Sequence, residues 1–213
     1  MASVIDIGNL ALGHLGEAAE VSSINPPEGS AYADHIARFY PVARDVALQD
    51  QGFPWSFAVR RVYLAVVMAP GDDGNPYVGR YAYAMPADCL QPTAVLTPGA
   101  DDANGDYFDT EVAANGSKLI ICDTPSAILK YTRVVDDPTK FTPLFLDALA
   151  WLLASYLAGP IIKGDAGATK ARECLGVYQS QIANARVADM RGRKVDTGYK
   201  DHRPDWIAAR GGY

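Results

Sequence analysis

The apolar residues at the start of the chain recur every three or four positions, which is the spacing of one face of an α-helix. Ser3 is placed to cap such a helix, and Gly16 is suited to ending it. The spacing therefore predicts a short amphipathic helix between these two residues, with an apolar face formed by Val4, Ile7, Leu10, Ala11 and Leu15.

A second helix is predicted after the Pro-Pro loop at residues 26–27. Ser30 is its candidate cap, and the helical spacing continues until near Gly52. Pro41 lacks an amide donor and is expected to kink the helix. The face toward the core is expected to carry Ile36, Tyr40, Ala43 and Ala47.

The pattern changes between Ser56 and Val135, where short runs rich in β-branched and aromatic residues alternate with turns. Two long turns, at residues 70–76 and 98–106, contain the glycine, proline, asparagine and aspartate that tight turns need. We expect both turns at the surface. The pattern predicts an antiparallel β region with strands at residues 59–64, 80–83, 119–121 and 127–132.

Helical spacing returns at Thr142, which is followed by proline at the first helical position. Over residues 144–157 the only charge is Asp147, and Gly159-Pro160 is expected to stop the helix. This leaves about 16 residues, fewer than the roughly 20 that cross a bilayer. We therefore expect a central helix buried within the protein, and no membrane contact.

A fourth, long helix is predicted from Asp165 until near Gly192. One stripe of this helix is suited to packing against the apolar third helix. The stripe consists of Ala171, Cys174, Leu175, Tyr178, Ile182, Ala185 and Asp189.

Residues 193–213 show no apolar period, hold three glycines and mix charges with isolated aromatic residues. A segment of this composition cannot bury enough surface to fold alone. The predicted fold class is therefore α+β. A four-helix core domain comprises residues 1–55 and 136–192, an inserted antiparallel β domain comprises residues 56–135, and an extended C-terminal arm comprises residues 193–213.

The net charge of the 213-residue chain is −6 and its pI is about 5.0, so the surface as a whole repels phosphate. Sequence-independent binding of nucleic acid is not expected as its main activity. The charge is uneven, because residues 186–213 carry seven basic and four acidic side chains, a net of +3. A basic end thus follows an acidic body.

The three cysteines, Cys89, Cys122 and Cys174, are far apart and odd in number, and no C-x-x-C pair indicates zinc. We expect them to be small apolar residues, buried in a protein of a reducing compartment. The first residues lack the basic flank and the cleavable apolar run of a secretion signal. The sequence therefore predicts a protein made and used in the cytoplasm.

No motif in the sequence indicates a catalytic, cofactor or metal site. The alternating spacing of Asp102, Asn104 and Asp106 opens a calcium loop, but Tyr107 and Ala113 stand where such a loop needs glycine and glutamate. We interpret it as an acidic surface turn. The histidines lack a neighbouring nucleophile turn and are expected to be solvated or packed: His14, His35 and His202.

Glu17 and Glu20 are the one carboxylate pair that suggests a glycosidase. Retaining glycosidases hold two carboxyls about 5 Å apart, and inverting enzymes hold them somewhat further apart. A spacing of three residues arises easily by chance, and nothing in the sequence indicates a sugar-binding cleft around this pair. Solvated charges are the preferred interpretation.

Five stretches, in order along almost the whole chain, carry a resemblance to a known family. They are residues 5–17, which end in Leu-Gly-Glu; 40–65, with Pro-Trp-Ser-Phe-Ala; 81–90, with Pro-Ala-Asp-Cys-Leu; 178–189; and 206–210. Together they resemble the tail tubular protein A family of head-to-tail adaptors in short-tailed bacteriophages. The acidic turns at residues 71–75 and 99–106 lie outside the resemblance.

The resemblance implies a structural virion protein at the head-tail junction, without enzymatic activity or a cofactor, assembled in the host cytoplasm. About twelve copies are expected to form a closed ring with their helical domains side by side. Each arm is expected to reach along the portal protein, while the opposite face receives the tail nozzle protein. Tail fibres are a further candidate partner, DNA passes only as cargo, and the free protein is expected to be a monomer.

The residues expected to dock on the portal lie in the arm. The segment around Trp206 lacks the apolar residues that would form a core of its own, and Arg203 and Arg210 flank the tryptophan. This composition is typical of an interface anchor. A tail with stray aromatic residues is the plainer alternative. The predicted docking residues are Tyr199, Arg203, Trp206, Ile207, Arg210 and Tyr213.

Two other functions remain open for the same sequence. A tail-associated hydrolase of cell wall or polysaccharide would use Glu17 or Glu20 as its acid. Another neck or tail-completion protein would use the same helical scaffold at a different position between head and tail.

Overall fold

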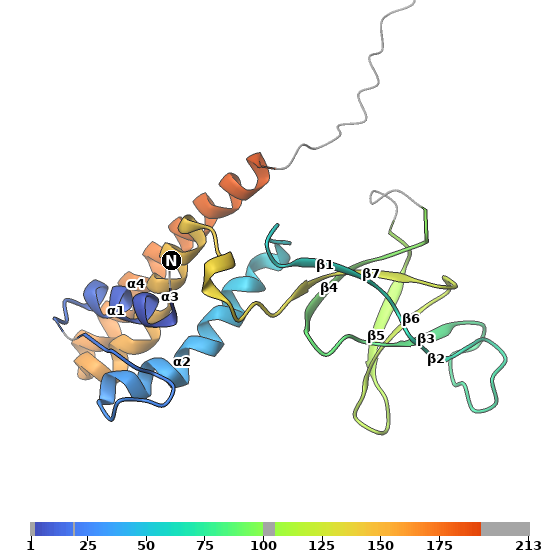
Figure 1. The fold of residues 1–213 in the computed structure, drawn as a ribbon, viewed down its shortest axis with the longest axis horizontal. Helices are drawn as coiled ribbons and strands as arrows, with labels where there is room; N and C mark the ends of the chain where they lie inside the picture. Colours follow the sequence, from blue (N-terminus) through green and yellow to red (C-terminus); the bar gives the residue numbers. More distant parts are fainter. Residues whose placement is uncertain (1–2, 19, 100–104, 193–213) are drawn as a thin grey trace, which may run out of the picture.

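The chain is an α+β protein whose helices gather on one side and whose strands gather on the other (Figure 1). The computed structural model describes residues 3–18, 20–99 and 105–192. Within these residues every strand lies between the second and third helices along the chain, as the sequence predicted. The helices are α1 (Val4–Leu15), α2 (Ala31–Leu48), α3 (Pro143–Ile162) and α4 (Gly164–Arg191), with 3₁₀ turns at Asp50–Gly52 and Pro138–Lys140.

Serine caps start the first two helices, as predicted. The Ser3 hydroxyl accepts a hydrogen bond from the Asp6 amide at 3.1 Å, and the Asp6 carboxylate accepts one from the Ser3 amide at 2.8 Å. This reciprocal pair satisfies amides that the helix itself leaves unpaired. Gly16, with φ of 83°, ends α1 in a left-handed conformation that favours glycine. Ser30 starts α2 with a simpler cap, in which its hydroxyl accepts a hydrogen bond from the Ala33 amide at 3.2 Å.

Two details of these helices differ from the prediction. Leu10 is 39% exposed, so it does not belong to the buried face of α1. The second helix ends at Leu48, because Gln51 has φ of 48° and residues 50–52 form a separate 3₁₀ turn. The helix continues past Pro41. The predicted face of α2 is confirmed, since all four of its residues are buried: Ile36, Tyr40, Ala43 and Ala47.

The third helix is the central helix of the protein, as predicted. It is long and apolar enough to cross a membrane, but 56% of its most apolar window is buried within the protein. Helices α1, α2 and α4 all pack against it. The predicted stop at Gly159-Pro160 is wrong, because the helix continues to Ile162. Pro160 lies in the last turn, where losing one amide donor disturbs little of the helix.

The fourth helix packs along α3 over much of its length. Gly167 makes this close packing possible, because a Cβ atom there would lie 2.9 Å from the Ala158 carbonyl oxygen. One member of the predicted stripe is wrong: Leu175 is 39% exposed and points away from the core. The buried residues of the stripe are Cys174, Tyr178, Ile182, Ala185 and Asp189.

The strands form two antiparallel sheets, with orders β1-β7-β4 and β2-β3-β6-β5. Four strands correspond to predicted runs: β1 (Val59–Tyr63), β3 (Tyr81–Ala84), β6 (Lys118–Cys122) and β7 (Ile128–Arg133). Three strands were not predicted: β2 (Val66–Met68), β4 (Cys89–Leu96) and β5 (Phe108–Val112). Strand β4 contains Pro92 and two register shifts, and β5 alternates acidic side chains with others, so neither has a clear strand signal.

Two separate hydrophobic clusters hold the two parts of the chain. The larger cluster lies among the helices and includes Trp55, Phe145 and Val135. The smaller cluster lies among the strands and includes Tyr83, Leu129 and Tyr131. Each part of the chain therefore buries an apolar core of its own.

Trp55 lies where the helices give way to the strands, and it is fully buried in the larger cluster. Its indole nitrogen donates a hydrogen bond to the Ala47 carbonyl at 3.2 Å. Its ring lies 4.8 Å from the ring of Phe53 and 4.9 Å from that of Phe145, both edge-on. The expectation of a core tryptophan at this junction is confirmed.

Gly8 and Gly13 on α1 provide a matched test of helix packing. A Cβ atom at Gly8 would lie 2.9 Å from the fully buried Ile36 side chain, whereas one at Gly13 would meet nothing within 4 Å. We expect Gly8→Ala to lower the free energy of unfolding by about 1 kcal/mol, because overpacking outweighs the gain in helix propensity. We expect Gly13→Ala to raise it by about 0.5–1 kcal/mol. Urea denaturation followed by circular dichroism measures both, and equal effects would contradict this packing.

Candidate functional site

The end of α4 is the candidate site, because the predicted arm follows immediately after it. Figure 1 shows the last turns of α4 extending beyond the other helices. The helix ends at Arg191, and Gly192 is the last described residue. The six predicted docking residues all lie outside the described residues: Tyr199, Arg203, Trp206, Ile207, Arg210 and Tyr213.

Asp189 fixes the end of α4 to the junction between helices and strands. Its side chain is buried, at 8% exposure. The carboxylate accepts hydrogen bonds from Ser56, one from the backbone amide at 3.2 Å and one from the hydroxyl. Hydrogen bonds to an ionised group are stronger than neutral ones, so they offset part of the cost of burying this carboxylate. Ser56 directly follows Trp55, so the root of the arm is tied to the core.

Arg186 fixes α4 one turn earlier, through an ion pair with Asp50 at 2.8 Å. Both side chains are mostly buried, at 17% and 19% exposure, and the Arg186 guanidinium also donates to Gln51. Burial, together with the nearby Asp50 carboxylate, raises the pKa of Tyr178 well above its ordinary value. Losing one partner of a buried pair leaves the other charge uncompensated, so this pair holds α4 firmly against the turn after α2.

Large apolar side chains are exposed on the outer side of α4. Val187 is 47% exposed and Met190 is 55% exposed. With Phe53 they border a shallow hollow of about 460 Å³. A second exposed pair lies one turn apart on α2, where Val42 is 53% and Val46 is 41% exposed. Gathered apolar side chains of this kind mark candidate surfaces for contact with another protein.

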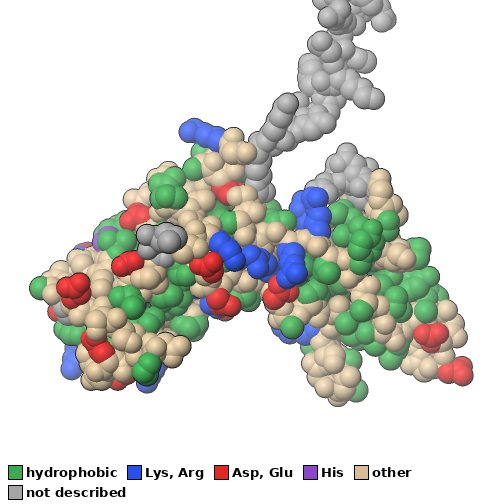
Figure 2. Space-filling model, in the orientation of Figure 1, with side chains coloured by type: hydrophobic (Ala, Val, Ile, Leu, Met, Phe, Trp, Pro, Cys, Tyr) green, Lys and Arg blue, Asp and Glu red, His purple; other side chains and the backbone are tan. Residues whose placement is uncertain are grey.

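Ion pairs bridge the seam between the helical and β parts. Arg44 on α2 pairs with Asp136, in the segment that returns from the strands to the helices. On the β side of the seam, Arg60 pairs with Asp88 at 2.9 Å, and the Tyr131 hydroxyl donates to the same carboxylate at 2.8 Å. Figure 2 shows basic and acidic side chains side by side where the two parts meet.

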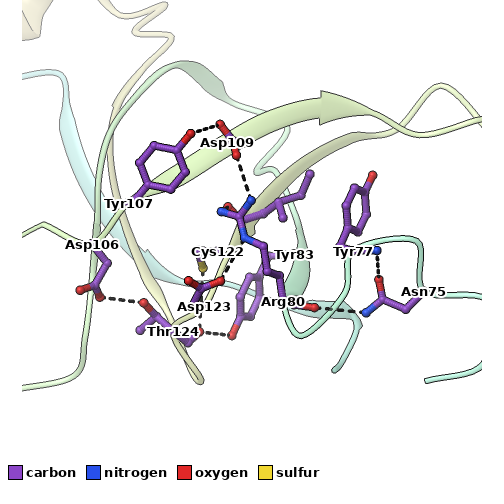
Figure 3. Close-up of polar contacts among 11 residues, drawn as sticks. Asn75, Tyr77, Arg80, Tyr83, Asp106, Tyr107, Asp109, Cys122, Asp123 and Thr124 are labelled. Atoms are coloured by element: carbon purple, nitrogen blue, oxygen red, sulfur yellow. Dashed lines mark hydrogen bonds and ion pairs between the residues drawn. The ribbon is translucent and has the colours of Figure 1, made fainter. Parts of the chain in front are cut away.

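Arg80 is the centre of a polar cluster on the four-stranded sheet (Figure 3). Its guanidinium pairs with Asp109 at 2.9 Å and with Asp123 at 3.0 Å, and it donates to the Ile121 carbonyl at 3.1 Å. It also lies 5.5 Å from the centre of the Tyr107 ring, within the range of a cation–π contact. The hydrogen bond from Arg80 is the main cause that holds the pKa of Asp109 below its ordinary value.

The Arg80 cluster ties loops to strands. Asn75 donates to the carbonyls of Ala69 and Arg80, and the Tyr77 hydroxyl donates to Glu111 at 3.0 Å. The loop that precedes β3 is thereby held against β5 and β6. We interpret the cluster as a brace for this sheet.

Asp106 holds the second long turn to the sheet. Its carboxylate accepts hydrogen bonds from Thr124 at 2.7 Å and from Thr97 at 2.8 Å, and these bonds lower its pKa. The two preceding members of the calcium-like pattern, Asp102 and Asn104, lie outside the described residues. Over residues 3–18, 20–99 and 105–192, no group of three metal-binding side chains is present.

The described histidines and the cysteines are packed. His14 stacks on Trp151 with ring centres 3.6 Å apart, and burial lowers its pKa. Cys122 and Cys174 are buried as expected, while Cys89 is only half-buried. Burial raises the pKa of all three thiols, that of Cys89 to about 11, so they stay protonated and unreactive at neutral pH.

The two candidate acids of the enzymatic alternative differ in their surroundings. Glu17 accepts a hydrogen bond from the Tyr32 hydroxyl at 3.1 Å, which joins the end of α1 to the start of α2. Glu20 lies on the exposed surface. Neither carboxylate lines any of the hollows described for the end of α4 or the start of α3.

Comparison of the chain with protein-family models and with curated protein sequences finds no match. Function is therefore proposed from the residues and their geometry alone.

The sequence placed Asp189 on the packed stripe of the fourth helix, but it did not reveal the partners of the polar residues that organise the candidate site. Asp189 lies 133 residues from Ser56, and Arg186 lies 135 residues from Gln51. Arg80 is separated by 29 residues from Asp109. Contacts between residues so far apart in the chain leave no local sequence pattern. The one signal in the sequence was an arginine, Arg80, close to acidic turns.

The Arg80 brace predicts a defined pH dependence of stability. A carboxylate whose pKa is lowered by folding stabilises the protein above the ordinary value of 3.8, and this contribution is lost as pH falls through the lowered pKa. We expect Arg80→Gln to be less stable than the natural protein at pH 7, and the difference to shrink below pH 3.8. Urea midpoints at pH 7 and pH 3 measure this. The exposed Arg38→Gln is the control, and a difference independent of pH would contradict the brace.

Proposed function

We propose that this chain is the head-to-tail adaptor of a short-tailed bacteriophage, a structural virion protein that forms a ring between the portal and the tail nozzle. We also propose its domain organisation: a four-helix core domain, a β domain inserted between α2 and α3, and a C-terminal arm that binds the portal. The stretches that resemble the adaptor family carry the assignment, and the geometry of the end of α4 supports it.

The observation that supports the arm best is the anchoring of α4. Asp189 and Arg186 hold the last turns of the helix to the junction, through Ser56 and Asp50 respectively. Because the arm follows a helix end that is fixed to the core, binding of the arm to a partner would also fix the position of the rest of the protein. An arm attached to a loose helix end would not do so. The net charge of +3 over residues 186–213 suits an acidic partner surface.

The ring requires two different flanks that fit one another, because a closed ring is built from heterologous contacts. The exposed pair Val42 and Val46 on α2 and the exposed pair Val187 and Met190 on α4 are the candidate flanks. Both consist of aliphatic side chains on helices of the core, which suits side-by-side packing of helical domains. We propose that one flank of each copy meets the other flank of its neighbour.

In this proposal the β part makes the contact on the face opposite the portal, where the tail component binds. Its two sheets lie away from the end of α4 in Figure 1, and strand side chains are exposed at their edge, including Tyr63 at 67% and Val66 at 53%. These residues suit contact with a tail component. DNA remains cargo, in keeping with the net charge of −6.

Portal binding by a single-residue variant tests the proposal. We expect Trp206→Ala to weaken binding to the cognate portal ring by about thirtyfold, because a central aromatic anchor contributes roughly 2 kcal/mol or more to an interface. The natural chain, mixed with portal, should add a further ring that electron microscopy places against the portal. Gel filtration with and without portal measures the binding.

The exposed Val78→Ala on the β part serves as the matched control, because Val78 is 94% exposed and lies in the loop before β3. It should bind portal as the natural chain does. Unchanged binding by Trp206→Ala would remove the arm from the proposal. No binding by the natural chain would remove the adaptor function itself.

A further inference from the structure

Two hollows meet at Pro143, in the first turn of α3. The first, of about 390 Å³, runs from Gly192 and Ala188 at the end of α4 to Thr142 and Leu144. The second, of about 610 Å³, continues to α1 and is lined by Leu10, Pro138, Thr139, Phe141, Leu146 and Asp147. Both hollows are lined by Pro143, so they lie next to one another between the end of α4 and α1, and we call the two together the α3 groove.

The α3 groove is largely apolar and open. Leu144 is 44% exposed and Leu10 is 39% exposed, although each belongs to a helix of the core. Pro138 and Leu146 line the same groove, so several apolar side chains face one unfilled hollow. This explains why Leu10, which the sequence placed on the buried face of α1, is exposed. An open apolar groove of this size indicates an extended peptide as its occupant.

The groove also contains a carboxylate that forms no ion pair among the described residues. Asp147 is half-buried in the wall of the second hollow, and over residues 3–18, 20–99 and 105–192 its electrostatic neighbour is His14, whose pKa is lowered by burial. At the other end of the groove stands Asp189, which is bonded to Ser56. A peptide with apolar and basic side chains therefore suits the groove better than an acidic one.

We infer that the α3 groove receives residues 193–213 of the same chain. The last described residue before this segment, Gly192, lines the first hollow. Residues 193–213 carry five basic and three acidic side chains, a net of +2, which complements the two carboxylates. They also supply Trp206 and Ile207, two adjacent large apolar side chains with arginines nearby, for the second hollow.

The length of the segment suffices for this contact. Trp206 is fourteen positions after Gly192, and a fully extended chain spans up to roughly 46 Å over fourteen positions. Helix α3, with 20 residues, is about 30 Å long. Trp206 can therefore reach any point along the groove. Attachment to the same chain also gives the segment a millimolar effective concentration, so a weak contact is enough to keep it bound.

Docking in the groove goes beyond the proposed function, because it describes the chain before any partner is present. A partner that takes Trp206 has to displace it from the α3 groove first. Residues 193–213 therefore occupy the groove in the free chain, and the groove is empty once a partner has bound Trp206. The segment thus acts as an internal competitor that delays assembly until a partner with higher affinity for it is present.

Site-specific crosslinking in the full chain tests the inference without any portal. A photoreactive benzoylphenylalanine replaces Leu144, and in a second variant Leu10, while the control replaces Leu175, which is equally exposed on α4 outside the groove. We expect the groove positions to crosslink residues 193–213 about tenfold more than the control position. Adding Trp206→Ala should lower that yield about tenfold, and Asp147→Asn about threefold. Mass spectrometry maps the crosslinked peptides.

Crosslinking in a mixture of isotopically labelled and unlabelled chains shows whether the bound segment belongs to the same chain or to another copy. Crosslinked peptides without any mixed-label product support the inference, whereas about half mixed-label products in an equal mixture, the result of random pairing, overturn it in favour of a neighbouring copy. Equal yields from Leu144, Leu10 and Leu175 also overturn it. Either result leaves the adaptor proposal standing, because that proposal depends on portal binding by the natural chain.

Discussion

The burial of α3 is the constraint on which the rest of the molecule depends. A helix with apolar residues on all its sides needs cover from several neighbours, and three other helices pack against α3. Close contact with α4 requires Gly167, where any side chain would meet the backbone of α3. The positions of α1, α2 and α4, and with them the exposed flanks on α2 and α4, follow from this requirement.

The strands leave this helical core and return to it at one place. Trp55 at the exit and Val135 at the return both belong to the core cluster of the helices. The strands bury a second cluster of their own, so their two sheets do not depend on α3 for an apolar partner. Arg44 and Asp136 close the seam between the two parts. Contacts made by the strands are thereby linked to α2, the helix that carries one exposed flank.

The buried polar groups of this protein join distant segments to one another. Asp189, Arg186 and Arg80 each connect an element to a loop or strand far away in the sequence. The surface also exposes apolar side chains, among them valines and leucines on the helices and those of the α3 groove. Exposed apolar side chains that gather in this way mark candidate surfaces for contact with another protein.

The sequence by itself determined the helices, their serine caps, the apolar character of α3 and the placement of strands between α2 and α3, because these depend on near neighbours and on local periodicity. It did not reveal β4 and β5, whose proline, bulges and acidic residues hide the strand pattern. It also placed Leu10 and Leu175 in the core. Only the tertiary structure decided where the covered sides of α1 and α4 end, and which arginine meets which carboxylate, because these depend on segments brought together from distant parts of the chain.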